Sequence, residues 1–129
     1  MGERGQVLIL DDWNNEKEPK GVYLYTHWGA TKLTGDVKRA LAKKWRWDNA
    51  EYLARIIFDE MKRVGEIERD EYRLKAYTDM GETGFGIGLH RCDDIWRLIT
   101  IDTKNQEVIV EDNGKEREYT FEEYIKLSF

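Results

Sequence analysis

The side chains best suited to chemistry fall in two short segments. His27 ends a β-rich run, and His90, Cys92, Asp93 and Asp94 lie close together further along the chain. Their nitrogen, sulfur and oxygen atoms are metal-ligand types, although the spacing fits no known zinc motif. In an acid–base mechanism His27 would be the general base and Asp93 or Asp94 would orient it. These residues support the hypothesis of a small metal-dependent or acid–base hydrolase.

Two arginines could assist such an enzyme by holding an anionic group. Arg55 lies in a segment with helical periodicity, and Arg91 lies between His90 and Cys92. A cation inside a compact metal site is unfavourable, which weakens the metal interpretation. Arg55 is better explained as a snorkelling or ion-paired side chain than as an active-site clamp. The sequence therefore predicts no catalytic residue, no metal ligand and no cofactor.

Glycine alternates with apolar residues between Gly84 and His90. The alternation predicts a strand with two different faces: one carries Phe85, Ile87 and Leu89, and the other carries Gly84, Gly86 and Gly88. A strand face without side chains indicates that something bulky approaches the backbone there. That object could be a ring of the same chain, such as Tyr23, Tyr25 or a nearby tryptophan. Alternatively, it could be a ligand or a partner surface.

The elements that must position these residues begin with two strands. Residues 5–12 contain a short apolar run closed by a polar loop at 11–20, and residues 21–28 are rich in β-formers. Alternation in the second run predicts two faces, with Val22, Leu24, Thr26 and Trp28 on one and Tyr23, Tyr25 and His27 on the other.

Two helices are expected next. Residues 35–45 show helical spacing, with Thr34 as a possible N-cap. Asp48 and Glu51 form a possible capping box for the second helix, and Trp47 is placed to pack on Tyr52. The apolar face of that helix is predicted to consist of Leu53, Ile56, Ile57, Met61 and Val64, with Gly65 as the stop.

The remainder of the chain reads mainly as strands. Residues 66–82 are ambiguous, and their alternation favours a strand. Residues 95–103 and 107–112 are β-rich, and Asn113-Gly114 predicts a two-residue hairpin that pairs Asp112 with Lys115 and Glu111 with Glu116. Thr120 and Glu123 form a capping box that opens a short terminal helix.

The element order is therefore β-β-α-α-(β)-β-β-β-β-α. Short connections favour antiparallel neighbours, so the predicted fold is a single α+β domain over residues 1–129. It consists of an antiparallel sheet of five to six strands with two helices on one face and a short C-terminal helix.

Composition limits the classes of partner and location. The formal net charge is −5, which argues against general attraction to nucleic acid or anionic membranes. The chain contains no apolar run long enough to span a membrane and no signal-peptide pattern at its start. Its single cysteine favours a reducing compartment. A cytoplasmic protein is expected.

Residues 35–45 carry the strongest nucleic-acid signal in the chain. Lysine and arginine predominate there, and Trp45 and Trp47 lie close by. Both tryptophans also have structural explanations, Trp45 on the apolar stripe of the helix and Trp47 at its staple position. Nucleic-acid binding through this helix remains an alternative function.

Three longer strings carry a resemblance: YTHWG, RWDNAEYLARIIFDEM and GFGIG. Together they resemble a group of small, uncharacterised prokaryotic and viral proteins. The resemblance covers most of the chain and implies a compact single domain. It implies no activity and no catalytic residue.

Aromatic residues supply the preferred hypothesis. Five tryptophans and seven tyrosines are many for 129 residues, and aromatic side chains are enriched at the centres of protein interfaces. The sequence favours a non-enzymatic binding or regulatory domain that acts through its aromatic and glycine-bearing sheet face, with a protein partner or as a homodimer. The predicted binding residues are Tyr23, Tyr25, His27, Trp28, Arg55, Gly84, Gly86, Gly88 and His90.

Overall fold

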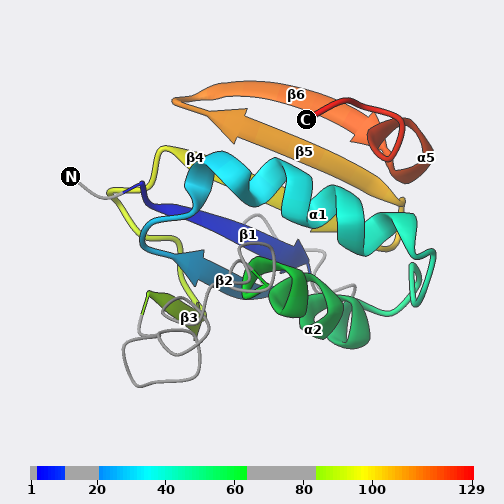
Figure 1. Ribbon diagram of the computed structural model, residues 1–129, viewed down its shortest axis with the longest axis horizontal. Helices are drawn as coiled ribbons and strands as arrows, with labels where there is room; N and C mark the ends of the chain where they lie inside the picture. The colour runs from blue at the N-terminus through cyan, green and yellow to red at the C-terminus, as the bar shows by residue number, and fades with distance from the viewer. Residues whose placement is uncertain (1–2, 11–20, 64–83) are drawn as a thin grey trace, which may run out of the picture.

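A computed structural model describes residues 3–10, 21–63 and 84–129. Its sheet has six strands in the order β3-β2-β1-β4-β5-β6 (Figure 1). The strands are β1 (Gly5–Leu10), β2 (Gly21–Thr26), β3 (Phe85–Gly88), β4 (Arg97–Asp102), β5 (Glu107–Asp112) and β6 (Lys115–Thr120). The predicted loop at 11–20, the predicted strand at 66–82, and the predicted helix residues Val64 and Gly65 lie outside the described part of the chain.

The fold class is α+β as expected, but the prediction of an antiparallel sheet is wrong at one position. β1 and β4 are parallel, and the other neighbouring pairs are antiparallel. The parallel pair arises because the chain leaves β3 at one edge of the sheet and passes β2 and β1 before it enters β4 on the far side of β1. The connection at 89–96 is short, but it crosses over two strands and does not form a hairpin. The expectation that short connections join antiparallel neighbours therefore fails here.

Gln6 holds this crossover against the sheet. Its side chain is almost fully buried, and its amide donates to the carbonyl of His90 (3.2 Å) and accepts from the backbone N–H of Cys92 (2.9 Å). A buried amide without partners would be costly, so these two bonds explain how a polar residue fits inside β1. The crossover therefore lies on the sheet face that Gln6 shares with Leu8 and Tyr23.

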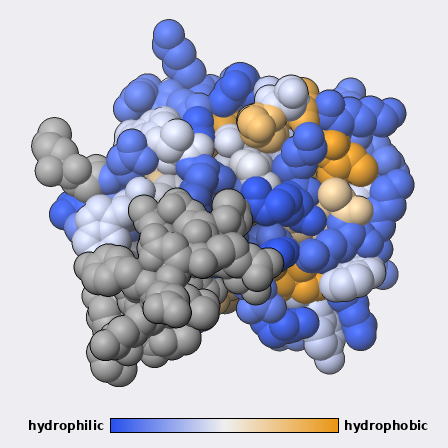
Figure 2. Space-filling model, in the orientation of Figure 1, coloured by the Kyte–Doolittle hydropathy of each residue, from blue (hydrophilic) through white to orange (hydrophobic). Residues whose placement is uncertain are grey.

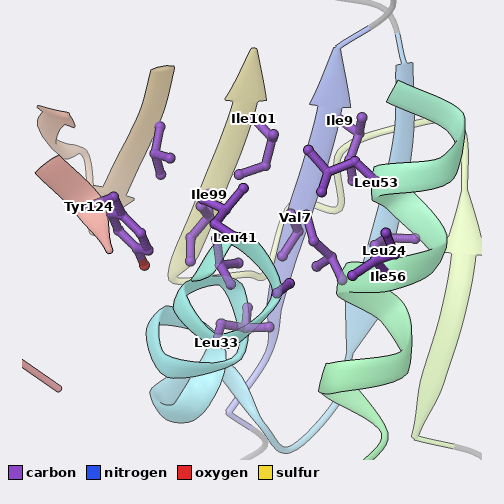
Figure 3. Close-up of a cluster of buried hydrophobic side chains, with 14 of the residues drawn as sticks. Val7, Ile9, Leu24, Leu33, Leu41, Leu53, Ile56, Ile99, Ile101 and Tyr124 are labelled. Atoms are coloured by element: carbon purple, nitrogen blue, oxygen red, sulfur yellow. The ribbon is translucent and has the colours of Figure 1, made fainter. Parts of the chain in front are cut away.

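The opposite face of the sheet is covered by helices α1 (Leu33–Ala42) and α2 (Ala50–Met61) (Figures 1 and 3). A short 3₁₀ turn, Ala30–Lys32, leads into α1. The main core forms between this face and the helices and includes Val7, Ile9, Leu24, Leu33, Leu41, Leu53, Ile57, Ile99, Ile101 and Tyr124. Four residues of the predicted apolar face of α2 are buried as expected, namely Leu53, Ile56, Ile57 and Met61.

Several predicted boundaries and caps require correction. Helix α1 begins and ends earlier than the predicted 35–45, because Lys32 is its N-cap and Thr34 lies buried inside it. The cap of α2 is Asn49, whose side chain accepts from the backbone N–H of Tyr52, so the Asp48–Glu51 box is wrong by one residue. The ring of Trp47 packs on Phe121 at 5.2 Å, and its indole N–H donates to the Leu41 carbonyl, in place of the predicted contact with Tyr52.

The C-terminal hairpin follows the prediction closely. Asn113 and Gly114 have φ values of 51° and 85°, as a two-residue turn with both central residues in the left-handed region requires. Strand β6 therefore pairs with β5 in the predicted register, with Asp112 opposite Lys115 and Glu111 opposite Glu116. The predicted Thr120–Glu123 capping box is present and opens α5 (Phe121–Tyr124).

A buried ion-pair network joins α1 to α2. Asp36 receives hydrogen bonds from Lys32 and Arg39, and Arg39 also donates to Glu60 on α2 at 3.1 Å. Burial raises the pKa of Asp36 despite these cations. Burial also favours the neutral form of Glu60, but hydrogen bonds from Arg39, Lys43 and Arg63 outweigh it and lower the pKa of that carboxyl. The network directs Arg39 of α1, and Lys32 and Lys43 at the two ends of the helix, toward α2.

The outer surface on the helix side is mainly hydrophilic, with small separate apolar areas (Figure 2). Among the described helices, none is long and apolar enough to cross a membrane.

Candidate binding surface at the glycine-bearing edge

The pairing of β2 with β3 brings most of the predicted binding residues together. Tyr25 is opposite Gly86 and Tyr23 is opposite Gly88, so each tyrosine has a glycine as its cross-strand neighbour. The same cross-strand row continues from Tyr25 to Gln6 on β1, which places these residues on the face opposite the helices. The predicted two-faced character of the glycine strand is therefore confirmed within Phe85–Gly88.

Strand β3 forms one edge of the sheet, and its pairing determines which backbone groups point outward. The N–H of His27 donates to the carbonyl of Gly84 at 2.7 Å. Hydrogen-bonded and non-hydrogen-bonded pairs alternate along an antiparallel ladder, so Gly84, Gly86 and Gly88 direct their N–H and C=O groups toward β2. Phe85 and Ile87 direct theirs away from the sheet. In the described part of the chain, no hydrogen bond to this outer side of β3 is present.

Among the described residues, a ring covers the glycine strip at one end. A Cβ atom at Gly84 would overlap the ring of Trp28, so this tryptophan lies directly against the Gly84 backbone. At Gly86 and Gly88, an added Cβ atom would meet no atom of the described residues within 4 Å. The prediction that rings cover the bare strand is thus confirmed at Gly84, and at Gly86 and Gly88 no ring of the described residues provides such cover. Trp28 also departs from the predicted alternation, because β2 ends at Thr26.

The two tyrosines are occupied elsewhere. Tyr23 is buried in a small second cluster with Leu8 and Leu98, on the β1 side of the face. Burial raises its pKa, and nearby Arg91 partly offsets this effect. The hydroxyl of Tyr25 is 2.9 Å from Nδ1 of His27, and this bond holds its ring toward the end of β2. These contacts explain why neither ring lies over its neighbouring glycine.

An aromatic group therefore closes one end of the glycine strip. The ring of His27 is 6.2 Å from that of Tyr25 and 4.7 Å from that of Trp28, in an edge-on contact with the latter. Trp28 remains 62% exposed, and Ile87 and Leu89 are 65% and 72% exposed. Large apolar side chains are exposed along this edge, although isolated ones are common on any surface.

The remaining predicted residues do not join this surface in the same way. Arg55 lies on α2, which covers the other face of the sheet, and its exposed side chain pairs with Asp59. His90 lies in the crossover with an exposed side chain, and its described contact is the backbone bond to Gln6. The prediction that Arg55 belongs to this binding surface is therefore not supported, because α2 lies on the opposite face of the sheet.

The geometry gives no support to the hydrolase hypothesis. Nδ1 of His27 is bonded to Tyr25, Asp94 is paired with Arg4, and Arg91 is paired with Glu111 at 2.6 Å. No aspartate of the described residues is therefore seen to orient His27, and Arg91 already has an anionic partner. Within the described residues, no cluster of three or more histidine, cysteine, aspartate or glutamate side chains could hold a metal ion.

The basic segment of α1 is also largely committed to contacts within the chain. Lys32 and Arg39 bind Asp36, Lys43 pairs with Glu60 at 3.2 Å, and Lys38 donates to the carbonyl of Leu127. Beyond the helix, the ring of Trp45 is 59% exposed between Lys44 and Arg46, which have φ values of 57° and 59°. Because the helix ends at Ala42, these residues form a turn and leave no continuous basic helix face.

Sequence reasoning missed two features of the surface. The exposed positions of Ile87 and Leu89 depend on β3 being an edge strand, which follows from sheet order and not from local pattern. The crossover held by Gln6 was missed because a single glutamine in an apolar run gives no signal of its partners.

Comparison of the chain with protein-family models, curated proteins and solved structures finds no match.

Proposed function

We propose that this protein is a non-enzymatic binding domain that accepts an extended peptide segment of another protein along the outer side of β3. The observation that carries the proposal is the pair of outward-facing backbone groups at Phe85 and Ile87, beside exposed apolar side chains. Unpaired N–H and C=O groups on a sheet edge are a template for an added strand. Main-chain hydrogen bonds would supply affinity, and side chains on the two faces would supply specificity.

Charge supports an apolar, extended occupant. Residues 84–90 contain no acidic or permanently charged side chain, so an approaching strand meets little electrostatic repulsion. Arg91, the next residue, is already paired with Glu111. Native proteins usually protect an edge with lysine, glutamate or proline, and β3 carries none of them.

A peptide is a better occupant than a second copy of this chain. A stable dimer usually buries roughly 1,200–2,000 Å² in total, and β3 is four residues long. Pairing two such short strands edge to edge falls well below that area. A flexible segment, by contrast, can add contacts on both faces of the sheet beyond β3 itself.

The test uses proline substitution at one outward-facing position on each edge. Ile87→Pro removes an N–H that points away from the sheet, a place where strands tolerate proline. Glu118→Pro is the matched control, since the register of the hairpin also directs the Glu118 N–H outward. The probe is a fluorescein-labelled peptide of alternating valine and tryptophan with lysine at both ends, and the readout is fluorescence anisotropy.

We expect Ile87→Pro to weaken binding of this peptide at least about tenfold, the equivalent of 1.4 kcal/mol, because strand addition needs the lost donor. Glu118→Pro should leave the affinity unchanged, and both variants should keep their far-ultraviolet circular dichroism. Equal affinity of Ile87→Pro and the unaltered protein would contradict the proposal. So would a stable dimer in light scattering that Ile87→Pro converts to monomer, since that result would make a second copy the occupant.

A further inference from the structure

The glycines at 86 and 88 have no explanation within the described fold. Neither has a positive φ, since Gly114 is the one described glycine in the left-handed region. Neither is crowded, because a Cβ atom would meet no described atom within 4 Å. Glycine inside a strand costs roughly 0.5–1 kcal/mol relative to alanine. Two such residues on one face of a four-residue strand therefore suggest that another molecule needs the bare backbone.

We infer that the strand bound along β3 places an aromatic side chain over Gly86 and Gly88. This inference rests on the proposed function and names the kind of residue that the edge selects. The added strand would alternate its side chains between the two faces of the sheet, as β3 does. On the helix side they would meet Phe85 and Ile87, and on the other side they would meet bare backbone bordered by Tyr25.

The distance across β3 determines the size of the side chain. Neighbouring strands are about 4.8 Å apart, so a residue on the added strand lies two spacings, roughly 9.6 Å, from Tyr25 on β2. With glycine between them, an aromatic side chain can reach across and contact the Tyr25 ring edge-on, an arrangement with centroids about 4.5–7 Å apart. A valine or alanine side chain is too short to reach it. The aromatic ring of the partner would then cover Gly86 and Gly88 in the way that Trp28 covers Gly84.

A second copy of the chain would supply no such ring from within Phe85–Gly88. In a symmetric antiparallel pair of β3 strands, the two-fold axis is perpendicular to the sheet, so both strands keep their glycines on the same face. Gly86 and Gly88 of one copy would then lie beside the glycines of the other. The strip would stay bare, which is a second reason for a foreign strand.

The experiment compares three peptides with two forms of the protein. The peptides are the alternating valine–tryptophan probe and two versions of it, in which every tryptophan is replaced by alanine or by leucine. The protein forms are the unaltered chain and Gly86→Val, whose side chain would occupy the strip. Gly88→Val is a second variant in case Gly86→Val folds poorly. Affinities are measured by fluorescence anisotropy, with Ile87→Pro as the reference for loss of edge binding.

We expect the tryptophan peptide to bind the unaltered chain about tenfold more tightly than the alanine peptide, with the leucine peptide close to alanine. Gly86→Val should remove this difference, because its side chain would occupy the strip that the tryptophan ring needs. Equal binding of the three peptides, or a tryptophan preference that survives both valine variants, would overturn the aromatic inference. If Ile87→Pro still weakens binding in that case, the proposed function stands; if Ile87→Pro has no effect, both fail.

Discussion

The two edges of the sheet differ in chemistry. Strand β6 is lined by Lys115, Glu116, Arg117 and Glu118, and all four are exposed. Strand β3 has two glycines and an exposed isoleucine, with no charge. Both strands direct backbone groups away from the sheet, but an added strand at β6 would have to bring its side chains beside four charges. The contrast indicates that β6 is protected against strand addition and β3 is not.

The same contrast separates two uses of glycine. Gly114 has a φ of +85° in the turn that begins β6, so the backbone conformation requires it. Gly86 lies in ordinary extended backbone, and an added Cβ atom would meet no described atom within 4 Å, so the described fold does not require it. Glycine at the β6 edge therefore shapes the chain, whereas glycine at the β3 edge has no such conformational role in the described residues.

The largest effect on stability is expected at the end of β5, next to the turn that leads into β6. Asp112 accepts hydrogen bonds from Arg97 at 2.6 and 2.9 Å and from Arg117 at 2.8 Å. Asp112→Asn should lower the free energy of unfolding by about 2 kcal/mol at pH 7, because Arg97 loses its charged partner. Urea unfolding measures the change. Asp59→Asn, which removes an exposed ion pair with Arg55, is the control and should have almost no effect.

The same substitution has a pH signature. Hydrogen bonds from Arg97 hold the pKa of Asp112 below its ordinary value of 3.8. A lowered pKa means that the carboxylate stabilises the fold above pH 3.8 and that this contribution is lost as the pH falls through the folded-state pKa. The difference between Asp112→Asn and the unaltered protein should therefore shrink below pH 3.8. A difference that stays constant down to pH 2 would show that the charge is not responsible.

The next effect compares the two glycines directly. Gly114→Ala should lower the free energy of unfolding by about 1 kcal/mol, because alanine is strained in the left-handed region. Gly86→Ala should instead raise it slightly, since the added methyl group meets no described atom. Thermal or urea unfolding distinguishes the two signs. If both substitutions destabilise equally, the distinction between required and unrequired glycine is wrong.

A smaller effect separates the ends of the glycine strip. Gly84→Val should destabilise the protein because its side chain would displace the ring of Trp28. Gly86→Val should stabilise it by about 0.5 kcal/mol through better strand propensity. Tryptophan fluorescence should shift in the first variant and stay unchanged in the second. Destabilisation by Gly86→Val would show that the space above Gly86 is filled in the free protein.

The smallest effect concerns charge on the protected edge. Glu111 and Glu116 are directly opposite, and Glu111 is paired with Arg91. Glu116→Lys replaces a like-charge pair with an opposite pair and should add about 0.3 kcal/mol to the free energy of unfolding at low salt. Half-molar salt should remove the gain. Glu118→Lys, opposite Ile109, is the control and should change little.

The parts of the fold that local sequence determines could be predicted. Asn113-Gly114 set the hairpin register, Thr120 and Glu123 set the cap of α5, and the periodicity of Leu53 to Met61 set the buried face of α2. Each depends on residues within a few positions of one another. Their conformations are therefore readable without knowledge of the rest of the chain.

Features that depend on distant partners could not be predicted. The parallel pairing of β1 with β4 follows from the crossover at 89–96, and the position of β3 at the edge follows from the order of all six strands. The sequence predicted that the glycines share one face of a strand, but it did not predict which rings lie over them. The reason is that Tyr23 packs on residues of β1 and β4, and Tyr25 bonds to His27 after the end of β2. Residue types suggested the candidate surface, and the sheet order showed that its strand lies at an edge of the described sheet.

Hydrogen exchange at single amides of β3 tests the central claim most directly. In the free protein, the N–H groups of Phe85 and Ile87 should exchange rapidly with solvent, whereas those of Gly86 and Gly88 should be protected by their bonds to β2. Adding the valine–tryptophan peptide should slow exchange at Phe85 and Ile87 and leave the two glycines unchanged. Strong protection of Phe85 and Ile87 without peptide would show that this edge is already paired and would contradict the account.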